Sequence, residues 1–203
     1  MLTLRQARPD DLEALYNICL VTGASGQDAS GLHNDPQLIG HIYVAPYVVI
    51  EPEHALVAED DSGVAGYLVG THDTDRFAQA LEQDWWPALR DKYRDPALNL
   101  TPADRKRVAA IMVPDADPPA LVARYPAHIH MNLLPRLRGQ GVGRALTERW
   151  VAGARAAKVK GIHLGAGASN TGGRAFWAKV GFTPLEANER SAWFGMALDT
   201  DRA

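Results

Sequence analysis

The chain has 203 residues, of which 46% are hydrophobic and 22% charged, and its formal net charge at pH 7 is -3. This balance is that of an ordinary globular protein, and the charge gives no reason to expect nucleic acid or an anionic membrane as a partner. No stretch approaches the roughly 18 apolar residues that a membrane span needs.

Cys19 is the only cysteine, so an intrachain disulfide is excluded and a reducing compartment is expected. The first residues lack the basic start and apolar core of a secretory signal peptide. We therefore expect a cytoplasmic protein in which Cys19 is a small buried residue of a helix, not a nucleophile.

The first third of the chain predicts strands and helices of ordinary length. The first helix has a proline and two acidic residues at its start and a glycine at its end, which are typical helix boundaries. The predicted elements are a strand at 2–7, a helix from Pro9 to Gly23, a short helix at 36–41, and a hairpin of strands at 54–60 and 63–71.

Residues 72–126 interrupt this pattern with segments of helical spacing that are separated at Pro87, Pro96 and Pro102. The stretch is too short and too often broken by proline to hold a large core of its own. We therefore predict a helical insertion at 72–126 inside a single domain that spans 1–203.

Strands and helices alternate again after the insertion. The spacing of Val142, Leu146 and Trp150 predicts a helix with one face toward the core. The sequence therefore predicts an α/β fold with a mixed sheet and a strand–loop–helix unit at its centre. Its elements are strands at 127–134, 161–166, about 181–186 and 191–198, and helices at 141–158 and 170–180.

A glycine-rich turn joins the strand at 127–134 to the following helix. The first N–H groups of a helix lack acceptors within the helix, so this turn is a candidate anion site. Gly139 and Gly141 lack the third glycine of the dinucleotide fingerprint, because position 144 is Arg144, and the Walker pattern is absent. A tight turn without a ligand is the alternative for the glycines alone.

Arg138-x-x-Gly141-x-Gly143, preceded by Pro135, resembles the acetyl-CoA pyrophosphate loop of the GNAT superfamily of N-acetyltransferases. The resemblance implies the GNAT fold: a central, mixed, mostly antiparallel sheet flanked by helices, here with the helical insertion between the third and fourth strands. The order of predicted elements fits this fold along the whole chain. A second family landmark is present at Asn170, Gly173, Trp177, Gly181 and Phe182.

A narrower resemblance rests on GYLVGTHDTDRF, WWPALRDKY and HIHMNLLP. These stretches look like bacterial stand-alone relatives of the acetyltransferase-like domain at the C-terminus of O-GlcNAcase. That eukaryotic domain looks like a pseudo-acetyltransferase, so activity does not follow from the fold alone.

The family resemblance implies acetyl-CoA as the cofactor. Backbone groups of Leu133 and Leu134 would pair with the pantetheine arm, and one N–H there would polarise the thioester carbonyl. Asn170 would reach the pantetheine, although its position also suits a helix N-cap, and both roles can coexist. Phe176 and Trp177 would line the cofactor. The pyrophosphate would lie on Arg138, Gly139, Gln140, Gly141, Val142, Gly143 and Arg144.

The leaving thiol is commonly protonated in this family by a tyrosine at the position of Trp177. An indole N–H donates a hydrogen bond but does not transfer a proton. The thiol would then leave as an anion, or Tyr43 or Tyr47 would supply the proton. A protein that binds acetyl-CoA with weak or absent turnover is the alternative.

His128 and His130 titrate near neutral pH and are candidate bases. Arylalkylamine N-acetyltransferases carry such a pair on this strand, but at positions that correspond to Ala127 and Ile129 here. This register counts against direct proton transfer by the pair, because we expect the two histidines to face the other side of the sheet, either packed beneath a helix or in a polar channel with Asn132.

Further polar and aromatic candidates have simpler explanations as well. Asp73, Asp75 and His72 follow the third strand, where acceptors enter related folds, or they lie in a solvated loop. Asp28 and His33 lie in the predicted flexible loop at 23–35. Trp85, Trp86 and Tyr93 wall an acceptor cleft or fill the interior of the insertion.

The sequence therefore predicts an acetyl-CoA-dependent N-acetyltransferase that acts on a small amine or a protein lysine by direct attack in a ternary complex. The alternative is an inactive acetyl-CoA-binding or interaction module. The candidate catalytic residues are His130, Asn132, His128 and Asp73. No metal is predicted, because His-x-His lacks a third ligand in motif. Nucleic acid and membrane partners are not expected, and a homodimer is left open.

Overall fold

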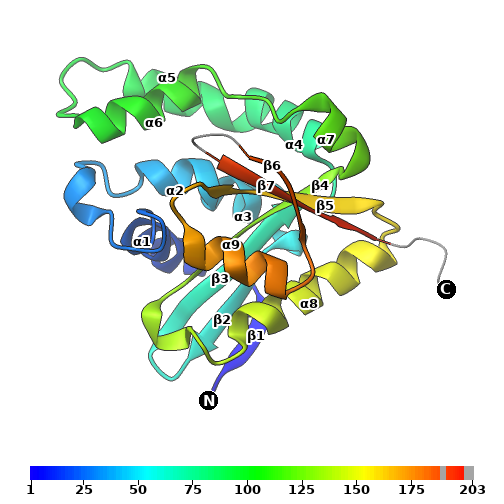
Figure 1. The fold of residues 1–203 in the computed structure, drawn as a ribbon. Coiled ribbons are helices and arrows are strands. Elements are labelled where there is room, and N and C mark those ends of the chain that lie inside the picture. Colours follow the sequence, from blue (N-terminus) through cyan, green and yellow to red (C-terminus); the bar gives the residue numbers. More distant parts are fainter. Residues whose placement is uncertain (188–190, 199–203) are drawn as a thin grey trace.

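The computed structural model describes residues 1–187 and 191–198. A seven-stranded sheet has the order β1-β2-β3-β4-β5-β7-β6, and only β4 and β5 pair in parallel (Figure 1). This confirms the predicted mixed, mostly antiparallel sheet. The strands are β1 (Thr3–Gln6), β2 (Leu56–Asp60), β3 (Gly63–Thr71), β4 (Ala127–Leu133), β5 (Gly161–Gly167), β6 (Thr183–Ala187) and β7 (Ser191–Ala197).

Helices cover both faces of the sheet. They are α1 (Leu12–Val21), α2 (Leu38–Tyr43), α3 (Ala45–Ile50), α4 (Thr74–Ala80), α5 (Trp86–Tyr93), α6 (Pro102–Met112), α7 (Pro119–Arg124), α8 (Val142–Ala156) and α9 (Thr171–Lys179). Short 3-10 turns lie at Pro9–Asp11, Ser30–Leu32, Pro52–His54 and Pro135–Leu137, and a π-helical turn lies at Leu81–Trp85. None of the helices in the described ranges is long and apolar enough to cross a membrane.

The alternation of side chains along the strands divides the core into two layers. On β3, Leu68 packs in the layer beneath α8 and α9, whereas its neighbour Val69 packs beneath α1 to α4. A third cluster joins α2 to the insertion through Leu38, Trp86 and Ile111. The insertion is therefore fastened to the first helices by its own apolar contacts.

Helix positions differ from the sequence prediction in the first half of the chain. The short second helix begins at Leu38, and α3 follows it without having been predicted. The valines of α3 favour a strand locally, but burial of Tyr47 and Val48 against the sheet decides for a helix. The segment from Thr74 to Tyr93 is helical as expected, with a π-helical turn in its middle.

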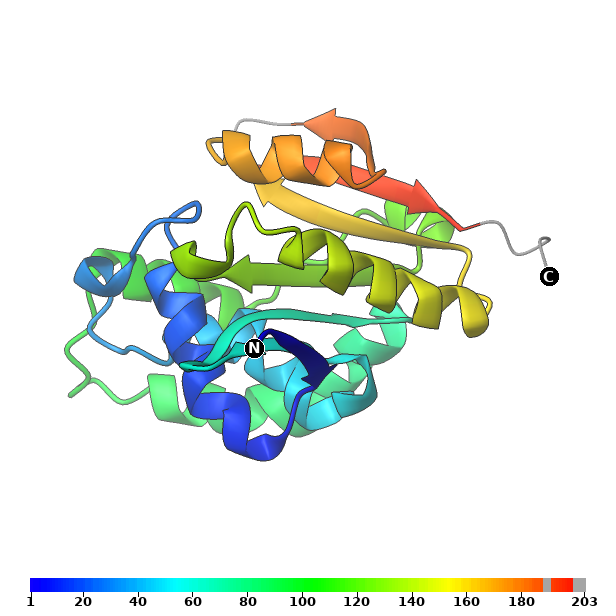
Figure 2. The ribbon, with the colours of Figure 1, turned by 90° about the horizontal axis from the view of Figure 1, so that it is seen from below.

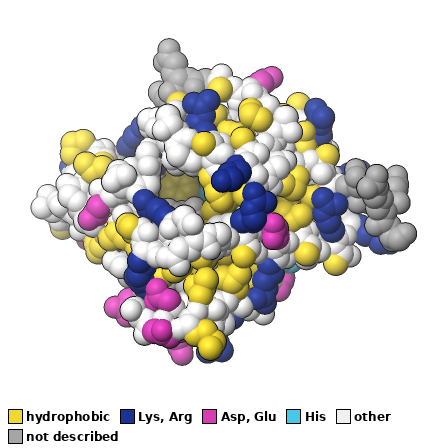
Figure 3. Space-filling view, turned by 60° about the horizontal axis from the view of Figure 1, so that its bottom comes forward, with side chains coloured by type: hydrophobic (Ala, Val, Ile, Leu, Met, Phe, Trp, Pro, Cys, Tyr) yellow, Lys and Arg dark blue, Asp and Glu magenta, His cyan; other side chains and the backbone are white. Residues whose placement is uncertain are grey.

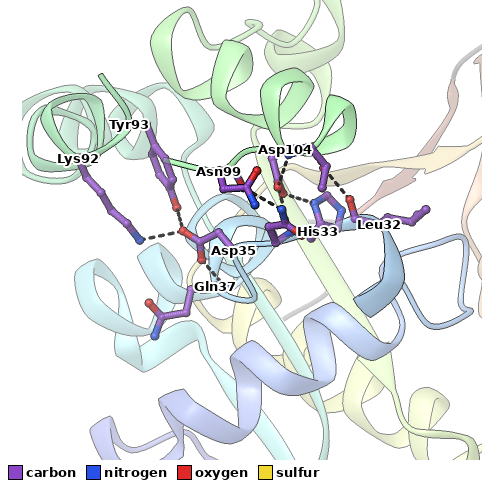
Figure 4. Close-up of polar contacts among 10 residues, drawn as sticks. Leu32, His33, Asp35, Gln37, Lys92, Tyr93, Asn99 and Asp104 are labelled. Carbon is purple, nitrogen blue, oxygen red and sulfur yellow. Dashed lines mark hydrogen bonds and ion pairs between the residues drawn. The ribbon is translucent and has the colours of Figure 1, made fainter. Parts of the chain in front are cut away.

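The loop before α2 is anchored to the insertion (Figure 4). Asp35 accepts hydrogen bonds from Lys92 Nζ at 3.0 Å and Tyr93 Oη at 2.8 Å. The buried carboxylate of Asp104 lies 2.7 Å from His33 Nδ1 and accepts from the backbone N–H of Asn34. Helices α5 and α6 therefore supply polar partners to this part of the loop.

Strands β4 and β5 pair only where they begin. Ala127 is paired with Ile162 and His128 with His163, after which the strands continue to Leu133 and Gly167 without further pairing. Figure 2 shows them diverging toward their C-terminal ends. The sheet is thus opened in its middle, next to the start of α8.

Candidate active site

The glycine turn after β4 exposes its backbone to open space. Gly139 and Gly141 have φ of 74° and 80°, a left-handed conformation that favours glycine. A Cβ built on either residue would meet no atom within 4 Å. Gly141 is the N-cap of α8 and gives it no side-chain cap, so the first N–H groups of this 15-residue helix are available to an anion.

Arginines around the turn hold the backbone in place. Arg138 donates from Nε to the carbonyl of Leu133 at 3.1 Å and from its guanidinium to the carbonyl of Gly26 at 2.9 Å. Arg136 is paired with Asp60 at 2.7 Å. Figure 3 shows the molecule hollowed on the side where α8 and α9 begin, with an apolar floor and Lys and Arg side chains around the rim.

The edge of β4 that faces the opening carries backbone groups without a strand partner. The N–H of Leu134 donates to the carbonyl of Ala65, on the β3 side, at 2.8 Å. Because neighbouring residues of a strand point their N–H groups to opposite edges, the N–H of Leu133 points toward β5. Pairing with β5 has already ended there, so within the described residues the N–H of Leu133, and not that of Leu134, has no strand acceptor and is an available amide donor.

The two histidines of β4 lie on the sheet face covered by the first helices. Ala127 and Ile129 pack in the layer beneath α8, so the residues between and after them face the other way. The Tyr47 hydroxyl, on α3, lies between His128 Nε2 at 2.7 Å and His130 Nε2 at 3.0 Å. The predicted face is therefore confirmed, and the pair belongs to a hydrogen-bonded polar cluster.

Asn132 shares this face but is held by α1 and β3. Its amide donates to the Thr22 hydroxyl, and its oxygen accepts from Tyr67 Oη at 3.1 Å. Thr22 in turn donates to the carbonyl of Ile18 at 2.6 Å. Asn132 is therefore held by Thr22 and Tyr67 and makes no hydrogen bond to a histidine within the described residues.

An acid and a third histidine join the cluster from other elements. His163 lies on β5 next to His128, with ring centroids 5.6 Å apart, and is 1% exposed. Its Nδ1 lies 2.6 Å from the carbonyl of Tyr125 and its Nε2 lies 3.1 Å from Asp117 Oδ2. These contacts hold the His163 ring between the carbonyl of Tyr125 and the carboxyl group of Asp117.

Burial controls the charges in this cluster. It lowers the pKa of His128 to about 3 and that of His130 to about 4, so both rings are neutral at pH 7. It also raises the pKa of Tyr47 well above its ordinary value. Burial alone would raise the pKa of Asp117, but the hydrogen bond from His163 and the nearby histidine rings keep it below its usual value.

The other predicted site residues are dispersed, and Asp73 follows β3 near the start of β4, at the end of the strand away from the opening. Asp73 is the N-cap of α4 and accepts from the N–H of Arg76 at 3.0 Å. Asn170 caps α9 by accepting from the N–H of Gly173 at 2.9 Å. Phe176 is partly buried and lies close to Gly143, whereas Trp177 is 7% exposed and packs in the core.

Sequence patterns did not indicate Asp117, His163 or Thr74 as members of the site. The one usable signal was the central position of His163 on a predicted strand after the glycine turn. Donor atoms of Asp117, His128 and His163 lie within 4.8 Å of one another, a grouping that could hold a metal ion. Hydrogen bonds already engage both ring nitrogens of each histidine.

Comparison with known families and proteins supports one assignment. The family model described as the acetyltransferase (GNAT) family matches residues 32–182. Protein O-GlcNAcase of Rattus norvegicus is 26% identical over 148 residues, and that of Mus musculus is 25% identical over 146 residues. Each match covers 71% of this chain and 16% of the relative, so the chain spans only a small part of their length.

Solved structures share the fold over nearly the whole chain. The crystal structure of SsHAT is 34% identical, with a TM-score of 0.83, and the match covers 97% of this chain and 98% of SsHAT. The structure of yncA from Salmonella typhimurium, solved with its cofactor acetyl-CoA, has a TM-score of 0.55 at 16% identity and covers 100% of this chain and 96% of yncA. The second likeness concerns the fold alone.

Proposed function

This chain belongs to the acetyltransferase (GNAT) family, and on that basis we propose that it is an acetyl-CoA-dependent N-acetyltransferase. The acetyl group is transferred to the amine of a small molecule or a protein lysine, by direct attack in a ternary complex. One arrangement supports the proposal above all: β4 and β5 part between the uncapped start of α8 and the neutral pair His128 and His130.

The residues around the opening fit acetyl-CoA. The open space before Gly139 and Gly141 leaves room for a pyrophosphate against the backbone of the turn and the start of α8. The free N–H of Leu133 suits a donor to the thioester carbonyl. When bound, acetyl-CoA supplies the acetyl group as a thioester.

His130 is the base in this proposal. Amines of the lysine type are mostly protonated at pH 7, so a neutral acceptor of their proton assists the attack. The ring of His130 is partly accessible, and its lowered pKa of about 4 leaves it unprotonated at pH 7 but a weak base, so in this proposal it takes the proton as the amine attacks and not beforehand. Leu133 follows it on the same strand and carries the amide donor, so one strand presents both groups.

A second candidate function is acetyl-CoA binding with little or no turnover. Trp177 favours it, because the indole replaces the tyrosine acid and packs in the core among Phe176 and Phe182. In the active protein the thiol then leaves as an anion, which its pKa of roughly 8.5 permits, or takes its proton from Tyr43 or Tyr47.

Calorimetry with acetyl-CoA and a thiol-release assay with a panel of amines and lysine peptides test these functions. We expect His130→Ala to lower kcat/KM by about 10²- to 10⁴-fold without changing acetyl-CoA affinity. The matched control is His54→Ala, outside the cluster. Absence of acetyl-CoA binding would reject both functions, and binding without release from any amine would favour the second.

A further inference from the structure

Thr74 sets the direction of a hydrogen-bond chain that ends at His130. Its Oγ1 lies 2.7 Å from the carbonyl oxygen of Pro126 and 2.8 Å from His128 Nδ1. A carbonyl oxygen only accepts, and a hydroxyl has one hydrogen. Thr74 therefore donates to Pro126, and Nδ1 of His128 must carry the hydrogen that Thr74 accepts.

The direction passes through Tyr47 to the second histidine. Since His128 is neutral, its Nε2 bears no hydrogen and accepts from the Tyr47 hydroxyl at 2.7 Å. The Tyr47 hydrogen is then committed, so its oxygen accepts from Nε2 of His130 at 3.0 Å. A neutral His130 with its hydrogen on Nε2 has an unprotonated Nδ1.

Nδ1 of His130 is open to an approaching group. The described residues give this nitrogen no hydrogen bond, and the His130 side chain is only partly buried. The chain thus leads from the fixed carbonyl of Pro126 to one accessible lone pair.

We propose that Thr74, His128 and Tyr47 are positioning residues that fix the tautomer of His130, so that its Nδ1 is the atom that takes the proton from the acceptor amine. This inference rests on the proposed acetyltransferase function. In the transfer, the amine nitrogen attacks the thioester carbonyl carbon, one of its N–H bonds breaks with the electron pair staying on nitrogen, and a new N–H bond forms at Nδ1, which leaves His130 as an imidazolium.

Charged groups from several elements face the chain. Asp117, from the segment before α7, and His163, on β5, lie beside His128. Tyr43, on α2, contacts the ring of His130 at its edge, with centroids 5.6 Å apart, and accepts from Arg107 of α6 at 2.8 Å. The negative charge of Asp117 favours a proton on His130 and the charge of His163 opposes it.

Nitrogen-15 NMR of histidine-labelled protein without acetyl-CoA reads the two tautomers directly. We expect the hydrogen on Nδ1 of His128 and on Nε2 of His130 near pH 7. Thr74→Val removes the hydroxyl that accepts the hydrogen bond from His128 Nδ1 and changes the side-chain shape little. We then expect a mixture of tautomers at both histidine rings. Thr74→Ser keeps the hydroxyl and is expected to restore the wild-type pattern.

Activity supplies the second measurement. We expect Thr74→Val to lower kcat by about 10- to 100-fold with little change in the KM for acetyl-CoA, and Thr74→Ser to recover most of it. Tyr47→Phe breaks the hydrogen bonds that link the two histidine rings. His130 should then lose its preference for the Nε2–H tautomer, while His128 keeps its hydrogen on Nδ1. This variant decides the matter if Thr74→Val fails to fold.

Two results would overturn the inference. One is a hydrogen on Nδ1 of His130 in the wild-type protein, or tautomers that Thr74→Val and Tyr47→Phe leave unchanged. The other is stoichiometric uptake of Zn²⁺ by Asp117, His128 and His163, since a metal would then set the ring orientation. If the tautomers are as expected but the protein shows no turnover, the proposed function is rejected and the assigned hydrogen-bond direction from Thr74 to His130 still stands.

Discussion

At the scale of single residues, burial of the histidines on β4 keeps their rings neutral at pH 7 and lowers the free energy of unfolding in acid. The pKa of His128 is lowered to about 3 and that of His130 to about 4, from an ordinary value of 6.5. Between these values the unfolded chain binds protons that the folded protein does not. Folding is therefore favoured above pH 6.5 and loses free energy as the pH falls toward 4.

We predict that the free energy of unfolding decreases below pH 6.5 by up to about 1.4 kcal/mol per pH unit for each of these histidines. Urea unfolding at a series of pH values measures it. The double variant His128→Gln/His130→Gln should show a shallower decrease between pH 6.5 and 4, because the two histidines no longer contribute. Some decrease should remain, because His41 and His72 also have lowered pKa values and stay in place. Parallel pH curves for the two proteins would contradict the assignment.

Single residues also show where sequence reasoning ends. Strand alternation predicted the face of His128 and His130, because the period of a strand is fixed by its backbone. The contact between Asp117 and His163 was not predictable, since it depends on where the segment before α7 crosses β5. For Asn170 the predicted helix cap is confirmed, and its role toward the cofactor stays a prediction.

At the scale of elements, the strand–turn–helix unit carries the proposed cofactor site. The sequence predicted a helix from 141 to 158, and α8 runs from Val142 to Ala156. Proline, closely spaced glycines and an apolar stripe specify such a unit locally. By contrast, α3 has no comparable local signal, and tertiary packing of Tyr47 produces it.

Two glycines of this unit give a matched pair of substitutions. Gly141→Ala places a Cβ on a residue with φ of 80° and is expected to cost about 1–2 kcal/mol in unfolding free energy and to weaken acetyl-CoA binding. Gly153→Ala, on an exposed position in the last turn of α8, is expected to stabilise by up to about 0.5–1 kcal/mol without affecting binding. Chemical unfolding and calorimetry measure both, and equal effects at the two positions would refute the argument.

At the scale of the whole molecule, the insertion is joined to the first helices by apolar and polar contacts. Leu38 and Ile111 pack together with Trp86, and the loop before α2 is bound to α5 and α6 through Asp35 and Asp104. The sequence predicted a helical insertion, but its docking depends on pairs that lie far apart in the chain. The insertion also holds Thr74 and Asp117, so it contributes directly to the polar cluster.

Asp104 is the polar centre of this junction. It is fully buried and accepts from His33 Nδ1 and from the N–H groups of Asn34 and Thr101. We predict that Asp104→Asn destabilises the protein by about 1.5–3 kcal/mol, because charge-assisted hydrogen bonds are lost in a buried place. Asp91→Asn, at an exposed ion pair, serves as the control and should cost less than about 1 kcal/mol in the same thermal or urea unfolding experiment.

Because pairing between β4 and β5 ends early, the sheet lacks interstrand hydrogen bonds at the place where the proposed cofactor needs space. If β5 continued to pair along β4 as far as Leu133, the protein would gain interstrand hydrogen bonds and lose the space for the proposed cofactor. Substitutions that tighten the middle of the sheet are therefore expected to be selected against even where they favour folding. A relative stabilised by full pairing of β4 with β5 would therefore lose the unpaired stretch on which the proposed activity depends.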